Sequence, residues 1–252
     1  MQLDGYRQRE NGMYILSRQE IDQISESILA EVCPENLVHP IPLNIDKIIY
    51  ETGLDIKFKY IGSLDSGILG LIVLGDEAEI LTLDECFTPV TTYENFGTIL
   101  INPQTMTHDR CYRDRYTKVH EISHYYMHKE FFRRLCGYGA INPSACIACR
   151  SMEIGPQNNA KTEYDWMEWQ ADNLAASLLM PKYIFLEYAK HVIRNAGNRK
   201  GYLVTDNSTD RNMAQDIIQQ IATRFKVSRR AAQIRMLHLG LIHYGNTVYT
   251  VY

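Results

Sequence analysis

The chain has 252 residues, a net charge of −4 and an ordinary globular composition, 45% hydrophobic and 22% charged. This length suits one large domain, or one domain with appendages. The negative charge argues against general affinity for nucleic acids, and no run of 18 apolar residues predicts a membrane span. Because the first twelve residues also contain no apolar signal segment, we expect a cytoplasmic protein whose six cysteines are thiols or metal ligands.

The first half of the chain predicts a tail, two helices and a small sheet. Residues 1–16 are polar and aperiodic and should form a loose or docked tail. Ser17 and Glu20 have the spacing of a capping box, and the isoleucines that follow at helical intervals predict a helix. A second helix is expected over 45–52. Apolar stretches then predict strands over 54–60, 68–74, 79–83 and 97–101, the first with its apolar side chains on one face.

The second half is mainly helical. Helical patterns cover 110–132, 163–180, 181–195, 213–225 and 229–239, and a strand-like segment covers 247–252. We therefore predict an α+β fold in three regions. These are a tail over 1–16, a main domain over 17–204, and a helix-turn-helix-like region over 205–252 that packs on the main domain.

The most informative motif is the H-E-x-x-H formed by residues 120–124. On a helix, residues four apart lie on one face, about 6 Å apart along the axis, so His120 and His124 can bind the same metal ion. Glu121 would lie beside the open coordination position, where a carboxylate can take a proton from water. The alternative is a surface helix that is rich in histidine. His128 continues the series but is too far from His120 to share its metal, so we expect it at the surface or behind the ligands.

A third ligand is expected because catalytic zinc usually has three protein ligands and one water. Glu168 lies in a helical segment with two tryptophans, and Asp172 follows four residues later on the same face. One carboxylate could bind the metal while the other accepts the N–H of a ligating histidine. The alternative is a solvated acidic face. The apolar neighbours of these residues favour the metal site, since spare carboxylates are costly near a core.

Three motifs together resemble the ImmA/IrrE family of zinc metallopeptidases: the H-E-x-x-H of residues 120–124, the E-x-x-A-D of residues 168–172, and the L-L-M-P of residues 178–181. The similarity runs from about residue 45 to residue 240. It implies a zincin-like metallopeptidase domain. In the family's pattern, His120, His124 and Glu168 would bind Zn²⁺, and Glu121 would be the catalytic general base.

The same resemblance implies a regulatory role. Members of the family are bacterial or phage-borne, and the known ones cleave helix-turn-helix transcriptional repressors, so a repressor of this kind is the expected protein substrate. The chain departs from the family in two ways: Asp172 stands where asparagine is common, and the connection between the ligand helices is longer and contains cysteines.

Tyr125, Tyr126 and Arg115 are candidates for stabilising the oxyanion, and the sequence does not choose among them.

The connection from about residue 133 to residue 162 contains Cys136, Cys146 and Cys149. A C-x-x-C pair can hold a structural zinc if further ligands join it, and Cys111 or His128 could supply one. Free thiols are the alternative, which we favour because a single C-x-x-C is a modest signal. A segment this long needs some order of its own in a compact domain.

The C-terminal region has a second interpretation. It carries five basic residues and no acidic ones after residue 217, so it could bind DNA or an acidic surface of a protein substrate. We favour a packing element and expect no DNA binding. Three functional classes follow from the sequence: a zinc endopeptidase, a catalytically silent repressor-binding partner and a DNA-binding regulator. Retention of Glu121 favours the endopeptidase. The sequence predicts no oligomeric state.

Overall fold

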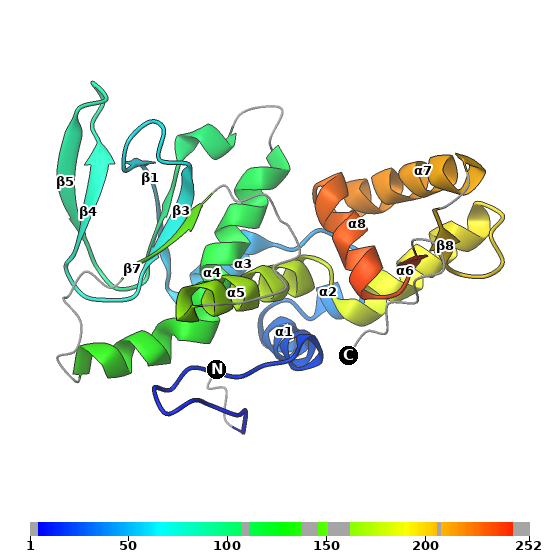
Figure 1. The fold of residues 1–252 in the computed structure, drawn as a ribbon, viewed down its shortest axis with the longest axis horizontal. Coiled ribbons are helices and arrows are strands. Elements are labelled where there is room, and N and C mark those ends of the chain that lie inside the picture. The colour runs from blue at the N-terminus through cyan, green and yellow to red at the C-terminus, as the bar shows by residue number, and fades with distance from the viewer. Residues whose placement is uncertain (1–4, 107–110, 138–145, 151–161, 206–207, 244–252) are drawn as a thin grey trace. The chain divides into compact units, whose positions relative to one another are not determined.

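The computed structural model describes residues 5–106, 111–137, 146–150, 162–205 and 208–243, which form a mixed α+β architecture (Figure 1). The chain divides into two compact units. Unit 1 contains residues 1–24 and 45–175, and unit 2 contains residues 25–44 and 176–252. Residues 25–44 and 176–204, which were predicted to belong to the main domain, group with the C-terminal helices in unit 2, and the predicted tail belongs to unit 1. Among the described helices, none combines the length and the apolar character needed to cross a membrane.

The N-terminal segment is docked through apolar residues. Met13 and Leu16 are buried, and helix α1 (Arg18–Val32) follows. Its capping box forms as predicted: the backbone N–H of Ser17 donates to a carboxylate oxygen of Glu20 at 2.7 Å, and the backbone N–H of Glu20 donates to Oγ of Ser17 at 3.3 Å. The short α2 (Glu35–Val38), for which the sequence shows no clear helical pattern, and α3 (Ile45–Thr52) come next.

The strands of unit 1 form two sheets rather than the single small sheet that was predicted. One has the order β1-β6-β3-β7, in which β1 and β6 are parallel and the other neighbours are antiparallel. The other is antiparallel, with the order β2-β4-β5. The strands are β1 (Asp55–Phe58), β2 (Tyr60–Ile61), β3 (Ile68–Val73), β4 (Ala78–Leu83), β5 (Pro89–Glu94), β6 (Thr98–Ile101) and β7 (Cys146–Arg150).

The predicted strand over 54–60 is wrong as a single element, because the chain leaves one sheet for the other at Lys59. Phe58 pairs with β6, whereas Tyr60 pairs with β4. The alternating side chains therefore do not share one buried face, and the Phe58 side chain is exposed. Strand β5 was missed because its outward residues are polar or exposed, and β7 because it lies in the aperiodic cysteine-containing connection.

The two sheets share a core, and the four-stranded sheet also supports a long helix. Side chains from both sheets form one apolar cluster: Ile61, Leu71, Val73, Ala78, Ile80 and Leu100. On β3, alternate residues point to the opposite face. There α4 (Cys111–Gly137) packs against β3 and β6, as the green helix beside β3 in Figure 1 shows. A short 3-10 helix (Pro103–Met106) precedes α4 in the sequence and contacts it.

Most of helix α5 (Glu163–Leu179) belongs to unit 1, and its last residues belong to unit 2. Unit 2 continues with α6 (Lys182–Asn195), α7 (Ser208–Phe225) and α8 (Arg229–His238). The ring centroids of Phe185 and Phe225 lie 5.3 Å apart in its core. Strands β8 (Leu203–Val204) and β9 (Ile242–His243) form a parallel pair. The strand predicted over 247–252 lies outside the described residues.

Candidate metal centre

Helix α4 places the H-E-x-x-H motif against the four-stranded sheet. His120 and His124 lie one turn apart and are almost completely buried, with exposed fractions of 2% and 0%. Val119 and Ile122, on either side of His120 in the sequence, are fully buried as well. The helix is therefore buried on most of its circumference in this turn, polar residues included, and the two imidazoles are themselves almost inaccessible to solvent.

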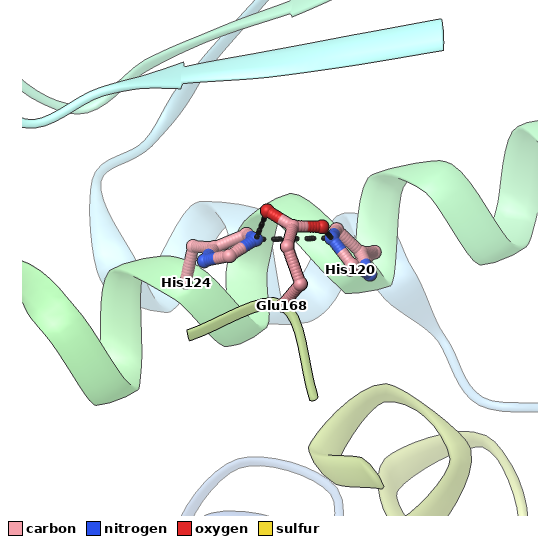
Figure 2. A group of neighbouring side chains, drawn as sticks. All are labelled: His120, His124 and Glu168. Atoms are coloured by element: carbon pink, nitrogen blue, oxygen red, sulfur yellow. Dashed lines mark hydrogen bonds and ion pairs between the residues drawn. The ribbon is translucent and has the colours of Figure 1, made fainter. Parts of the chain in front are cut away.

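Helix α5 brings Glu168 to the two histidines. Its carboxylate oxygens lie 3.3 Å from Nε2 of His120 and 3.3 Å from Nε2 of His124, and the two Nε2 atoms lie 2.9 Å apart (Figure 2). One ligand atom from each residue can be chosen such that all three lie within 4.8 Å of one another. Two imidazole nitrogens and a carboxylate that converge in this way could hold a metal ion. The structure thus brings the three predicted ligands together.

The protonation of these groups suits a cation. Burial disfavours the ionised form of Glu168, but the adjacent imidazoles of His120 and His124 outweigh it, and the pKa of this carboxyl lies well below the usual value for glutamate. Burial also lowers the pKa of the His124 imidazole, so its neutral form is favoured. An ionised carboxylate and a neutral imidazole are the forms in which these side chains bind metals.

Asp172 accepts hydrogen bonds at the outer side of the site. Its Oδ1 lies 3.0 Å from Nδ1 of His120 and 2.9 Å from the hydroxyl of Tyr116, which donates to it. The contact to His120 is the one proposed from the sequence. A carboxylate at Nδ1 fixes the proton there and leaves the lone pair of Nε2 directed at the metal position. Tyr116 was not singled out in the sequence analysis, although it lies four residues before His120 on the same helix face.

Glu121 points toward the sheet. Burial raises the pKa of its carboxyl to about 8, and the charge of Glu168 adds to the shift; a positive charge on His120 and the backbone N–H of Ile72 act against it. Neither carboxyl oxygen has a hydrogen bond of ordinary geometry among the described residues. A Cβ atom on Gly70 of β3 would lie 2.7 Å from Oε1 of Glu121 and 2.6 Å from Cγ2 of Thr117, so only glycine leaves room at this position. A fully buried carboxyl with a pKa raised this far is a candidate functional group.

His128 is not a surface residue, which decides between the two positions predicted for it. It is 1% exposed, and its Nδ1 lies 3.0 Å from Nδ1 of His124. Burial, with the neighbouring His124, lowers its pKa to about 3, so His128 is neutral. On its far side it contacts Gln170 of α5, a residue that no sequence motif indicated. The repeat of three histidines at intervals of four was the only available signal for this arrangement.

The other predicted residues lie elsewhere or outside the described part of the chain. Tyr125 contacts Phe96 and Lys129, with a ring centroid 4.3 Å from Nζ of that lysine. The side chains of Cys136, Cys146 and Cys149 are not among those described, so the predicted structural metal site falls outside the described residues. Only the backbone of β7, which includes the last two, is placed, in antiparallel pairing with β3.

No family model and no curated protein matches the chain. The similarity to ImmA/IrrE metallopeptidases therefore depends on the three sequence motifs alone. The candidate metal-binding group of His120, His124 and Glu168 is independent of that similarity, because the side chains of α4 and α5 converge in the structure.

Proposed function

We propose that the protein is a zinc-dependent endopeptidase that cleaves a helix-turn-helix transcriptional repressor. The observation that carries the proposal is the convergence of His120, His124 and Glu168, with the carboxyl of Glu121 buried beside them. A purely structural metal site has no need of such a carboxyl. A hydrolytic site needs a base next to the position of the attacking water.

The donor set supports zinc. Two imidazoles and one carboxylate are the protein ligands of a common class of zinc peptidases, and they leave one coordination position for water. The same donors also bind iron(II) in oxygenases. The glutamate directly after the first histidine favours hydrolysis, because an oxygenase does not need a general base at that position.

A bound zinc ion would supply Lewis-acid activation of a water molecule and of the peptide carbonyl. Glu121 would accept a proton from that water and later deliver it to the leaving amine nitrogen. A nearby cation favours the ionised carboxyl, so metal binding would lower the pKa of Glu121 from its raised value. The tight packing of this side chain against Gly70 would keep it in position for both transfers.

The exposed fractions of the side chains suggest the side from which a substrate would approach. The side chains of Glu168 and Asp172 are 22% and 42% exposed, whereas both histidine ligands and Glu121 are buried. A peptide would therefore reach the metal position from the side of the two α5 carboxylates. Because the Tyr116 hydroxyl donates to Asp172, its role there is to hold that carboxylate.

The substrate class comes from the resemblance to the ImmA/IrrE family. The test is incubation of the purified protein with the helix-turn-helix protein encoded beside its gene, with and without a chelator, and with the Glu121→Gln variant as a matched control. We expect specific cleavage by the zinc-loaded protein only. Binding without cleavage would support the catalytically silent partner instead, and cleavage that persists in the chelator would contradict a metal mechanism.

Several basic residues of the helix-turn-helix-like region are used within unit 2, which favours packing over DNA binding. Arg235 is buried, and its Nε donates to the carbonyl of Met180 at 3.1 Å. Arg224 lies over the ring of Tyr188, and Arg229 donates to Gln215. We expect no salt-dependent binding to duplex DNA. A gel shift at low salt that Arg229→Glu with Arg230→Glu abolishes would establish the DNA-binding alternative.

A further inference from the structure

A chain of hydrogen bonds runs from the ligand His124 to the backbone of the N-terminal segment. Nδ1 of His124 lies 3.0 Å from Nδ1 of His128, and Nε2 of His128 lies 3.0 Å from Oε1 of Gln170. Nε2 of Gln170 then donates to the carbonyl oxygen of Tyr14 at 2.7 Å. The three side chains are each 2% exposed or less, so water does not compete with these contacts.

The hydrogen bond to the Tyr14 carbonyl determines which atoms of this series donate and which accept. A backbone carbonyl can only accept, so the amide nitrogen of Gln170 must face Tyr14. Trp166 donates from Nε1 to the same carbonyl at 3.1 Å, so both lone pairs of that oxygen are used. The amide oxygen of Gln170 therefore faces His128, and Nε2 of His128 must carry a proton to donate to it.

The protonation of His128 in turn determines which nitrogen of His124 carries the proton. A neutral imidazole has one protonated nitrogen, so Nδ1 of His128 is an acceptor once Nε2 is the donor. Nδ1 of His124 must in turn be the donor between the two rings. This leaves Nε2 of His124 unprotonated, with its lone pair directed toward Nε2 of His120 and the carboxylate of Glu168.

We propose that His128 and Gln170 are positioning residues. Through a chain of hydrogen bonds that ends at the Tyr14 carbonyl, they hold His124 in the tautomer that binds metal. The inference rests on the metal-binding part of the proposed function and not on the identity of the substrate. It also links the metal site to the docking of the N-terminal segment. His120 obtains the same tautomer from Asp172, so the two ligands are oriented by different means.

The variants for the test separate acceptor loss from loss of volume. His128→Leu removes the acceptor for His124. His128→Asn keeps an oxygen at the position of Nδ1 and should restore it. Gln170→Met has a similar length and removes both hydrogen bonds of the amide. Ser123→Ala is the matched control. It removes a buried hydrogen bond on the same helix, from Oγ of Ser123 to the Val119 carbonyl, and this hydrogen bond does not involve the histidines.

Two readouts are needed. In the full-length protein, nitrogen-15 NMR of the imidazoles should show His128 protonated at Nε2 only, both without and with zinc, and this preference should be lost in Gln170→Met. Zinc affinity, measured by competition with a chelator, should fall about 10- to 100-fold in His128→Leu and Gln170→Met. It should stay close to the original value in His128→Asn and Ser123→Ala.

The outcomes distinguish this proposal from the proposed function. A His128 protonated at Nδ1, or equal zinc affinity in His128→Leu and the original protein, would overturn the positioning role even if the protein is an active peptidase. Failure of the original protein to bind zinc would contradict the proposed function. The NMR measurement would still decide in that case whether the hydrogen bonds run from His124 through His128 and Gln170 to the Tyr14 carbonyl.

Discussion

The two histidines of the candidate metal site are alike in sequence but differ in surroundings. Nδ1 of His120 contacts Asp172, whose side chain is 42% exposed. Nδ1 of His124 contacts His128, which is 1% exposed. The Asp172 side of the site is therefore open to solvent, and the His128 side is dry. Two ligands on one helix can thus depend on their partners to different degrees, because water can replace a lost partner only on the open side.

The proposed base is also shielded from solvent, so we group it with His128 as the dry part of the site. Glu121 is fully buried and packs on Gly70, and its carboxyl has the raised pKa of about 8. The open side holds the carboxylates that a substrate would meet, Glu168 and Asp172. We infer a division of labour, in which the dry side fixes geometry and protonation and the open side admits water and peptide. The following changes test that division, beginning with the largest expected effect.

Removing both histidines should abolish zinc binding, on which the open side and the dry side both depend. We expect His120→Ala with His124→Ala to lower zinc from about one ion per chain to nearly none, since a lone carboxylate does not retain the metal. Elemental analysis after dialysis measures this. Cys146→Ser with Cys149→Ser is the control for a separate ion on the cysteines, and we expect it to leave the metal content unchanged. Undiminished zinc in both variants would place the metal elsewhere.

Changing the base on the dry side should separate metal binding from catalysis. Glu121→Gln keeps the shape of the side chain and removes its ability to accept a proton. Cleavage of the repressor should slow by about 10² to 10⁴. Zinc content and the thermal unfolding temperature should remain close to those of the original protein. Equal turnover by the variant would assign the base to another residue.

Filling the space beside Glu121 tests how tightly the dry side is packed. Gly70→Ala places a Cβ atom within 2.7 Å of both Thr117 and Glu121, so the helix or the strand must shift. We expect a loss of about 1–3 kcal/mol in unfolding free energy, measured by urea denaturation. Adding Thr117→Ser removes one of the two colliding atoms and should recover part of the loss. No change in stability would show that this contact relaxes freely.

The smallest effect is expected on the open side. Asp172→Ala removes the partner of His120, but water can reach Nδ1 in its place. Zinc affinity should fall by about tenfold or less, near the lower end for a partner of a ligating histidine and below the loss in His128→Leu. Chelator competition on the two variants side by side measures the difference. A larger loss in Asp172→Ala would reverse the assignment of the open and dry sides.

Features that depend on local geometry could be predicted from the amino-acid sequence. The capping box of Ser17 and Glu20 and the helix over 45–52 follow from residues a few positions apart, and the structure has both. The placement of His120 and His124 on one face is of the same kind, since the helical repeat fixes it. Glu168 could be proposed only because chemistry requires a third ligand and the helix around it was recognisable.

Features that join distant segments became visible only in the folded chain. The division of the strand at Lys59 depends on which sheet each half joins, and alternation in the sequence cannot specify a pairing partner. The hydrogen bond from Gln170 to Tyr14 joins residues 156 positions apart. No local pattern encodes such a contact, because it exists only when the N-terminal segment, α4 and α5 pack together. The two histidines of the candidate metal site could thus be predicted from helical spacing, whereas the contacts of His124 with His128 and Gln170 depend on the packing of distant segments.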